Sequence, residues 1–426
     1  MGFVSVEALG GSQDGDVVIV GAGIVGLASA LHLQDRGFRV VVFDPGDPRG
    51  RASFGNAGVL SRNSIFPVAG PGIRRRLARY GLGRDVAVRL RFGSLPRLLP
   101  WVRRFIAAAD EAHWRESAHL LDSLVARAFE SHAELAGRVG ARHLIRANGW
   151  LRLYRDRASL DASALERSVL AEHHVRADVL SAEEIRQLEP GLARRFSHGL
   201  FFADSGSVES PGELVDFYAR AVAERGGRFV TEPVQRIEAG EGALSVHGAG
   251  TTVRARFVVL AAGARAADLA RPLGYRFPLA AERGYHRHFA LADGASLNRP
   301  IHDAAGGYVL SPMAGAVRLL TGVELALPDD PPDHRQIERV TADARRTIAL
   351  SDPIEPEPWM GSRPSTPDGR PIIGRSSRHP GLIFAFGHGH IGFANGPFTG
   401  RIVADLIAGS PPPIDIEGFS PRRFGG

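Results

Sequence analysis

A glycine-rich turn between an apolar strand and a helix constrains this chain more than any other feature. Residues 17–20 are all β-branched, which favours a buried parallel strand. Gly21, Gly23 and Gly26 follow in the pattern G-x-G-x-x-G. In such a turn the first glycine permits a tight bend, the second lets the backbone approach a pyrophosphate, and the third lets the helix pack close to the strand. The turn therefore predicts a dinucleotide site.

The residues after the turn complete a strand–helix–strand unit. A helix is expected from about Ile24 to Arg36, with its first N–H groups directed at phosphates and Gly37 just past its end. A second strand then ends on an acid 18 residues after the third glycine, near the spacing of a ribose-binding carboxylate. An acid here disfavours a 2′-phosphate and leaves NAD and FAD open. The predicted contacts of this unit are Gly21, Gly23, Ile24, Val25, Gly26 and Asp44.

The composition excludes several kinds of chemistry. With 426 residues the chain is long enough for two domains. It has no cysteine, and all of its 52 Lys+Arg residues are arginine, which excludes disulfides, thiolate metal sites, Schiff bases and a P-loop. The net charge is +6, but no zinc-finger spacing or RNA-binding signature accompanies it, so no nucleic-acid partner is predicted. Since no signal peptide or long apolar run is apparent, a cytoplasmic protein is expected.

Three later segments help to choose between NAD and FAD. Residues 257–264 form another buried strand that ends in small residues, 240 residues after the first strand. Residues 367–409 resemble a turn, a short strand, a glycine-rich loop and a helix from about Asn395 to Ala408. Between them lie about 100 residues of expected strands, including 283–291 and 307–323. The nucleotide domain is therefore expected in separated pieces, with a substrate domain in the gaps.

Five segments in this order resemble the D-amino-acid oxidase-like family of FAD-dependent oxidoreductases, in particular its D-amino-acid dehydrogenase small-subunit branch. The segments are GAGIVG (21–26), FGNAGVLS (54–61), VVLAAGA (258–264), WMGSRPSTPDGRPIIG (359–374) and GHGHIGFANG (387–396). The combination is specific, whereas any one motif is not. The resemblance implies noncovalently bound FAD and oxidation of the nitrogen-bearing carbon of a small amino acid.

The resemblance also implies the domain organisation. An α/β fold is expected, with a Rossmann-like FAD-binding domain of the GR2 type interleaved with an α+β substrate domain on a mixed, largely antiparallel sheet. The FAD-binding domain would comprise residues 16–62, 205–275 and 365–412, and the substrate domain residues 63–204 and 276–364. Residues 1–15 would be a flexible extension and residues 413–426 a tail.

Further cofactor contacts follow from the resemblance. It assigns Ser53, Asn56, Ala57 and Gly58 to a loop along the flavin, where small residues allow close approach, although an ordinary surface turn is the alternative. It places the Val234 backbone at the adenine end, with Ala262 and Gly263 at the end of the 257–264 strand. A loop before the last helix would stabilise the negative charge of reduced flavin through its N–H groups. Its members are Gly387, Gly389, His390, Ile391 and Gly392. No metal site is predicted. His388 and His390 have no cysteine or carboxylate at ligand spacing, and His286 and His288 share one strand face, where they are expected as polar strand residues or pocket lining.

Arg363 is the first candidate for binding substrate. Pro364 keeps it extended, and its planar guanidinium can grip a carboxylate with two hydrogen bonds. The family's G-x-R-P arginine binds the substrate carboxylate, although a structural ion pair is the alternative. Tyr308 matches a tyrosine of related enzymes that helps hold this carboxylate, with a core aromatic as the alternative. Tyr285 and His286 are weaker candidates for the pocket.

The implied reaction is hydride transfer from the α-carbon of a D-amino acid, or of a proline- or hydroxyproline-type imino acid, to flavin N5. The product hydrolyses to a keto acid and ammonia. The absence of lysine favours a quinone or carrier protein as electron acceptor, and an oxidase producing peroxide or the flavin subunit of a heteromeric complex stays open, as does a homo-oligomer. Residues 73–109 interleave arginines with apolar residues, which predicts peripheral contact with the inner face of the cytoplasmic membrane. A basic helical cover is the alternative.

Overall fold

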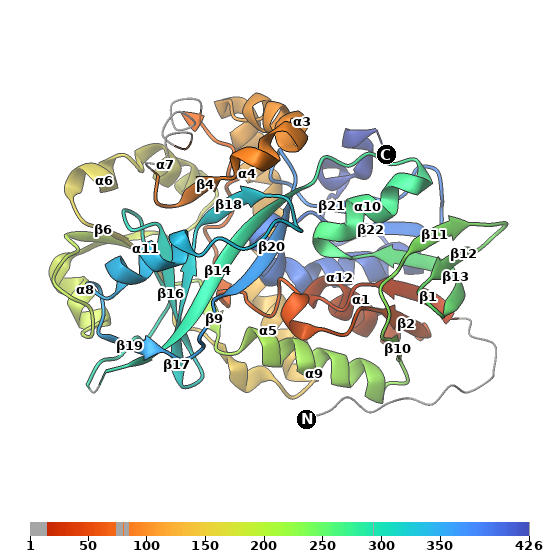
Figure 1. Cartoon of the computed structure of the whole chain (residues 1–426), viewed down its shortest axis with the longest axis horizontal. Helices are drawn as coiled ribbons and strands as arrows, with labels where there is room; N and C mark the ends of the chain where they lie inside the picture. Colours follow the sequence, from red (N-terminus) through yellow and green to blue (C-terminus); the bar gives the residue numbers. More distant parts are fainter. Residues whose placement is uncertain (1–14, 74–79, 81–84, 293, 426) are drawn as a thin grey trace.

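The computed structural model describes residues 15–73, 80, 85–292 and 294–425. Two large sheets form the framework of this part, the first on the right of Figure 1 and the second on the left. The long strands β14 (Ala280–Leu291) and β20 (Trp359–Ser365) run along the side of the second sheet that faces the first. This arrangement confirms the expected α/β fold. The predicted extension 1–15 lies outside the described residues except for Gly15.

The first sheet is eight-stranded in the described part, with a parallel centre and an antiparallel edge. Its main order is β10 (Arg228–Val230), β2 (Val40–Phe43), β1 (Gly15–Val20), β13 (Thr252–Leu260), β12 (Leu244–His247) and β11 (Arg236–Ala239). β22 (Leu382–Phe386) pairs with β13 in parallel and with β21 (Ile372–Arg375) in antiparallel. Strands far apart in the sequence thus share one sheet, as expected for a domain in pieces.

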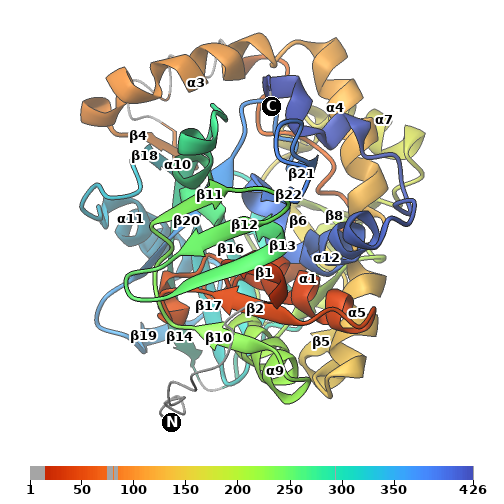
Figure 2. The same cartoon turned by 90° about the vertical axis from the view of Figure 1, so that its right-hand side faces the viewer.

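The apolar strand residues alternate between two cores. Val17 and Ile19 pack against helices on one face, and Val18 and Val20 pack on the other, which explains the continuous β-branched run. The helices of the first face are α1 (Ile24–Gln34), α5 (Ala128–Arg138), α9 (Pro211–Glu224) and α12 (Gly392–Ala408). The other face is covered by α10 (Ala266–Ala270) and by the β11–β12 edge, which Figure 2 shows toward the viewer.

The second sheet is mixed and largely antiparallel, as expected, with eleven strands in the described part. Its main order is β4 (Val88–Leu90), β18 (Val323–Ala326), β14, β17 (Ala316–Thr321), β16 (Tyr308–Met313), β15 (Ile301–Asp303), β6 (Trp150–Tyr154), β8 (His198–Phe202) and β7 (Asp178–Ser181). β19 (Leu350–Pro353) and β20 also pair with β14. A small third sheet joins β3 (Val59–Leu60), β9 (Gly206–Val208) and β5 (Ile145–Arg146).

The remaining helices surround the second sheet and the junction. They are α3 (Leu95–Ala107), α4 (Glu111–Val125), α6 (Arg157–Asp161), α7 (Ala164–Glu172), α8 (Ala182–Leu188) and α11 (Arg335–Ala344). Both α4 and α5 contact α12, which packs on the first sheet. The segment 63–204 therefore packs against both large sheets. The proposed domain limits remain predictions.

Candidate functional site

The carboxyl ends of four parallel strands meet at one edge of the first sheet. β1 lies between β2 and β13, and the chain proceeds from β1 toward β2 on one side and later adds β13 and β22 on the other. Ligands of open α/β sheets bind in the crevice at such a point. The segments that follow these strand ends are therefore the first place to look for a site.

The glycine turn after β1 has the geometry that its pattern predicts. Gly21 has φ +106°, and a Cβ there would lie 2.6 Å from the Ala261 carbonyl oxygen. A Cβ on Gly26 would lie 1.9 Å from the Gly21 oxygen, so only glycine lets α1 approach the turn. Gly23 faces open space: of the described atoms, only the Ser53 hydroxyl would lie within 4 Å of a Cβ added there. The turn thus leaves room for a pyrophosphate at its middle glycine.

Asp44 organises the same turn. Its Oδ2 accepts a hydrogen bond from Ala22 N at 2.8 Å, and its Oδ1 accepts from Gly46 N at 3.0 Å. Arg51 donates to Oδ1 at 2.8 Å and balances the charge of this buried carboxylate. The acid therefore holds β2 against the glycine turn. Its contact with a ribose stays a prediction.

The loop after β2 is fixed from both lobes. Ser53 Oγ accepts a hydrogen bond from Ile24 N at 3.0 Å, which ties the loop to the start of α1. From the second sheet, His286 Nδ1 donates to the Gly55 carbonyl at 3.1 Å, and Ser311 donates to the Ala57 carbonyl at 2.7 Å. Arg318 donates to the Asn56 carbonyl. A loop with its carbonyls occupied in this way offers a fixed surface to a cofactor.

The glycine loop before α12 lies at the end of β22. Gly387 and Gly389 have φ +80° and +54°, a conformation that favours glycine. His388 is buried and its Nε2 contacts Thr399 Oγ1 at 3.1 Å, whereas His390 is exposed. The loop bridges back to β20 through Ser365 and His388. Ile391 is the N-cap of α12, which begins at Gly392, so the helix N-terminus follows this loop directly; its contact with the flavin stays a prediction.

These segments fit FAD. Gly21, Gly23 and Val25 are partly exposed although the strand before them is buried, and so are Ala262 and Gly263 after β13. Asn56, Ala57 and Val234 are partly exposed as well, and Ser53 and Gly58 are buried. Accessible small residues at buried strand ends are what a long dinucleotide requires.

Arg363 lies on β20, which contacts both the segment after β13 and the glycine loop after β22. It pairs with Glu282 of β14 in the antiparallel register, and its side chain extends over Gly284 so that Nη1 donates to the Gly322 carbonyl at 3.2 Å. Within the described part of the chain it forms no ion pair. Burial lowers the pKa of Arg363, and the nearby Glu282 raises it. The guanidinium remains charged at neutral pH because arginine is a very strong base, and it is available to an anion.

Glu282 is a candidate that the sequence reasoning missed. It is 4% exposed, and its Oε2 has no hydrogen-bond partner among the described residues. Burial raises the pKa of this carboxyl, while Arg363 and Ser365 act to lower it. An acid inside the apolar stretch PLAAERGY was the available signal, since an acid in a buried strand needs a specific reason. Arg318 was missed too, because arginine is abundant in this chain.

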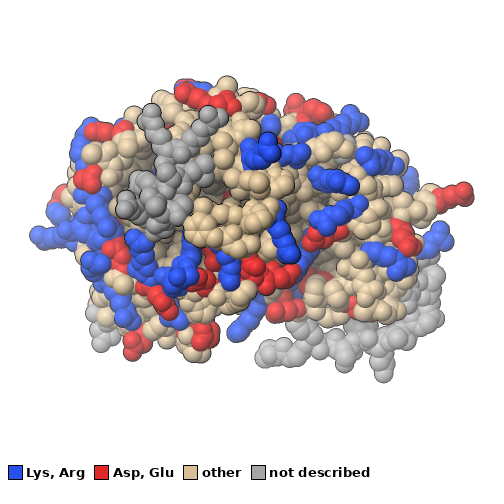
Figure 3. Space-filling view, turned by 45° about the horizontal axis from the view of Figure 1, so that its top comes forward, with Lys and Arg blue, Asp and Glu red and all other residues tan. Residues whose placement is uncertain are grey.

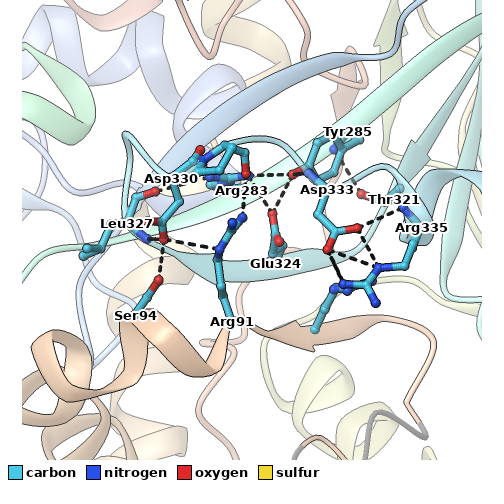
Figure 4. Close-up of polar contacts among 12 residues, drawn as sticks. Arg91, Ser94, Arg283, Tyr285, Thr321, Glu324, Leu327, Asp330, Asp333 and Arg335 are labelled. Carbon is cyan, nitrogen blue, oxygen red and sulfur yellow. Dashed lines mark hydrogen bonds and ion pairs between the residues drawn. The ribbon is translucent and has the colours of Figure 1, made fainter.

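Tyr285 and Arg283 lie on the opposite face of β14 from Glu282. Figure 4 shows their network, in which Arg283 pairs with Glu324 at 3.0 Å and donates to the Tyr285 hydroxyl at 2.7 Å. The Tyr285 hydroxyl donates to Glu324 at 2.6 Å and accepts from Asp333 N at 2.9 Å. These contacts hold the segment after β18 and do not bring Tyr285 to Arg363.

The other two predicted substrate residues also have structural partners. The Tyr308 hydroxyl contacts Asp303 at 3.1 Å and Thr347 at 2.6 Å, inside the core beside α11. His286 is 2% exposed and stacks on Trp359 with ring centroids 4.7 Å apart. Burial lowers the pKa of His286 to about 2, so the ring is neutral. Of the four predicted substrate residues, Arg363 is the one that offers a cation without an ion-pair partner in the described part of the chain. Direct substrate contacts of the other three stay predictions.

Comparison with known proteins agrees with this geometry. The sequence model of the family described as "FAD dependent oxidoreductase" (DAO) matches residues 16–406. The D-amino-acid oxidase of Bradyrhizobium diazoefficiens is 32% identical over 417 residues, which cover 96% of this chain and 98% of the relative. The D-amino acid dehydrogenase of Paramagnetospirillum magneticum is 30% identical over 429 residues, which cover 96% and 98%.

Solved structures share the fold. Glycine oxidase from Geobacillus kaustophilus superposes with a TM-score of 0.76 at 22% identity, covering 96% of this chain and 98% of that one. L-proline dehydrogenase from P. horikoshii gives 0.69 at 18% identity, covering 97% and 98%. These matches and the glycine turn together support the expected family. They also support the expected cofactor, noncovalently bound FAD at the ends of the buried strands. This chain belongs to the family of FAD-dependent oxidoreductases.

Proposed function

We propose that this enzyme oxidises a small amino acid, either a D-amino acid or a proline- or hydroxyproline-type imino acid, at the carbon that bears nitrogen. One observation carries the proposal: Arg363 presents a guanidinium with no ion-pair partner in the described residues, beside the crevice that fits FAD. The names of the relatives support the class, since two of them at 30% identity or more are named for D-amino acids and a structural neighbour is named for L-proline.

Arg363 binds the substrate carboxylate through paired N–H donors and thereby directs the α-carbon toward the cofactor. FAD, when bound, supplies flavin N5 as the acceptor of the α-hydrogen with its electron pair. The loop 387–392 and the N-terminus of α12 stabilise the negative charge that the ring gains. Water then converts the imino acid from a primary amine to a keto acid and ammonia, whereas the cyclic imine from a proline-type substrate opens to an amino keto acid and releases no ammonia.

The proposed electron acceptor is a quinone or a carrier protein. The chain has no lysine that could assist reaction with oxygen, and Arg283 at the corresponding stretch is engaged with Glu324. Relatives carry both the oxidase and the dehydrogenase name, so the acceptor needs a direct assay. Stoichiometric peroxide in air would assign an oxidase. Turnover of an artificial quinone by the purified chain alone would count against a need for partner subunits.

Peripheral membrane contact is proposed through α3, which lies at the top edge of the molecule in Figures 1 and 2. Leu99 and, just before the helix, Phe92 are 53% and 65% exposed, and the helix carries three arginines and no acid. Residues 74–79 and 81–84 of the segment lie outside the described residues.

Other observations limit this contact. Arginines and carboxylates are interspersed across the face turned forward in Figure 3. No helix in the described ranges is long and apolar enough to span a bilayer. Co-sedimentation with vesicles containing phosphatidylserine, compared with neutral vesicles, tests the contact. Recovery of the protein in the supernatant in both cases would reject it.

The central test is anaerobic. The purified protein, with its FAD content measured, is mixed with D- and L-amino acids and with both enantiomers of proline and hydroxyproline, and bleaching of the flavin band is followed. We expect bleaching by at least one of them, and a loss of at least about 100-fold in the apparent second-order rate for Arg363→Gln. Fully loaded enzyme that no member of the panel bleaches would overturn the proposal.

A further inference from the structure

Glu282 and Arg363 are direct neighbours across β14 and β20, yet they do not form an ion pair. Side chains at such positions project to the same face of a sheet, with their Cβ atoms about 5 Å apart. The guanidinium instead turns over Gly284 to the Gly322 carbonyl. The Glu282 carboxyl faces the other way, toward Ser365 and the glycine loop. The two residues are therefore adjacent in the sheet, while their charged groups point toward different partners.

The carboxyl of Glu282 lines a small cavity, and its Oε2 accepts no hydrogen bond from the described residues. The other lining residues include Ser365, Thr366, Gly387, Gly389 and His390. A buried carboxyl oxygen without a donor is costly, so its retention calls for a ligand that supplies one. The cavity borders the loop 387–392, and Glu282 is the direct cross-strand partner of Arg363, so a ligand of Glu282 would lie next to Arg363 and to that loop.

An α-amino acid matches this pair of groups. It carries a carboxylate and an ammonium on one carbon, and the protein offers an arginine and a carboxyl on one sheet face. We propose that Glu282 binds the amino group of the substrate and accepts its proton, while Arg363 holds the carboxylate. This inference rests on the proposed function and adds to it the group that selects for nitrogen.

The proton transfer completes the reaction. Glu282 takes one proton from the substrate ammonium, and the nitrogen regains its lone pair. That lone pair forms the C=N bond as the α-hydrogen leaves with its two electrons for FAD. Glu282 later returns its proton to solvent. Burial raises the pKa of Glu282 toward that of an amine, which makes the transfer less uphill.

The test compares ligands with and without nitrogen. Glu282→Gln keeps the shape and removes the base, and Glu238→Gln on the exposed strand β11 is the matched control. The reductant is the amino acid that bleaches the wild type fastest. The nitrogen-free ligand is propionate if that reductant is alanine, or cyclopentanecarboxylate if it is proline. Its Kd is measured from the perturbed flavin spectrum without turnover.

We expect Glu282→Gln to slow bleaching by about 100-fold and to lose the acid limb of its pH profile. The Kd of the nitrogen-free acid should change by less than about 3-fold, because Arg363 is intact. Equal losses for both ligands, or no loss for either, would overturn the inference. If the glutamine variant fails to retain FAD, Glu282→Asp serves instead, and it should keep the acid limb at a lower rate. A wild type that no amino acid bleaches would count against the proposed function, whereas a normal wild type with an unaffected variant would count against Glu282 alone.

Discussion

The guanidinium of Arg363 lies over the backbone of Gly284, in the space where any other residue would carry its side chain. A Cβ at Gly284 would lie 2.5 Å from Nη2 and 2.7 Å from Nη1. The backbone does not require glycine here, because Gly284 is within β14 and has no positive φ. Glycine at this position therefore leaves space for the Arg363 guanidinium and so determines the direction in which that side chain points.

Gly284→Ala is accordingly expected to displace Arg363 and to weaken carboxylate binding by about 10- to 100-fold, with FAD content unchanged. The Kd of a nitrogen-free carboxylic acid, measured by spectral titration, checks this directly. Gly137→Ala on α5 is the control, since no atom of the described residues would lie within 4 Å of a Cβ added there. An alanine variant that binds the acid as tightly as the wild type would show that Arg363 can bind from another position.

The glycine turn allows a sharper separation of roles. Gly26→Ala puts a Cβ 1.9 Å from the Gly21 oxygen, so it should lower both the Tm of the apoprotein and the affinity for FAD. Gly23→Ala meets no protein atom closer than 3.6 Å, so it should leave the apoprotein Tm unchanged and still weaken FAD, by about 10-fold or more. Thermal unfolding and fluorescence titration with FAD measure the two quantities. Normal FAD affinity in Gly23→Ala would place the pyrophosphate elsewhere.

The sequence predicted the first half of the site better than the second. The strand, glycine turn, helix and acid of residues 17–44 are local, and the helix predicted at 24–36 is α1 at Ile24–Gln34. The predicted strand 307–323 is the hairpin of β16 and β17, and the last helix begins at Gly392 rather than near Asn395. Turn chemistry and apolar periodicity act over short distances, and they suffice for such elements.

The residues around Arg363 depend on strand register and on which face of β14 meets the cofactor. Positions 280–286 of β14 are all buried, so alternation of polar and apolar residues could not distinguish its faces. The sequence therefore offers no means of telling that Tyr285, a weaker pocket candidate, and Glu282 lie on opposite sides of the strand. Pairing of β14 with β20 across about 80 residues decides this, and no local pattern encodes it.

Tyr285→Phe tests the assignment of the opposite face. Removing the hydroxyl takes an acceptor from Arg283 and from Asp333 N, and a donor from Glu324, so the free energy of unfolding should fall by about 1–3 kcal/mol. Tyr218→Phe is the control, because the Tyr218 hydroxyl is buried with no hydrogen-bond partner in the part of the chain that the structure describes, and its loss should not destabilise the fold. Urea unfolding measures both. A raised KM for Tyr285→Phe with unchanged stability would instead indicate contact with substrate.

His132 predicts how stability depends on pH. The ring is fully buried between α5 and α12, its Nε2 donates to the Phe393 carbonyl at 2.8 Å, and burial lowers its pKa from 6.5 to about 4. Between pH 6.5 and 4, therefore, the His132 ring is protonated in the unfolded chain and neutral in the folded chain. The contribution of His132 to stability is complete above this window and is lost as pH falls through it, by about 1.4 kcal/mol per unit and about 3 kcal/mol in all.

His132→Gln removes this titration and keeps an N–H donor. Its unfolding free energy, measured in urea at pH 7, 6 and 5, should fall less steeply with acid than that of the wild type, by the equivalent of about one proton. The absolute stability of the variant is not the readout, because repacking changes it at every pH. His143→Gln is the control, because His143 is exposed and its ring contacts Phe217. This variant should keep the wild-type slope of unfolding free energy against pH. Parallel curves for His132→Gln and the wild type would assign the acid sensitivity to other groups.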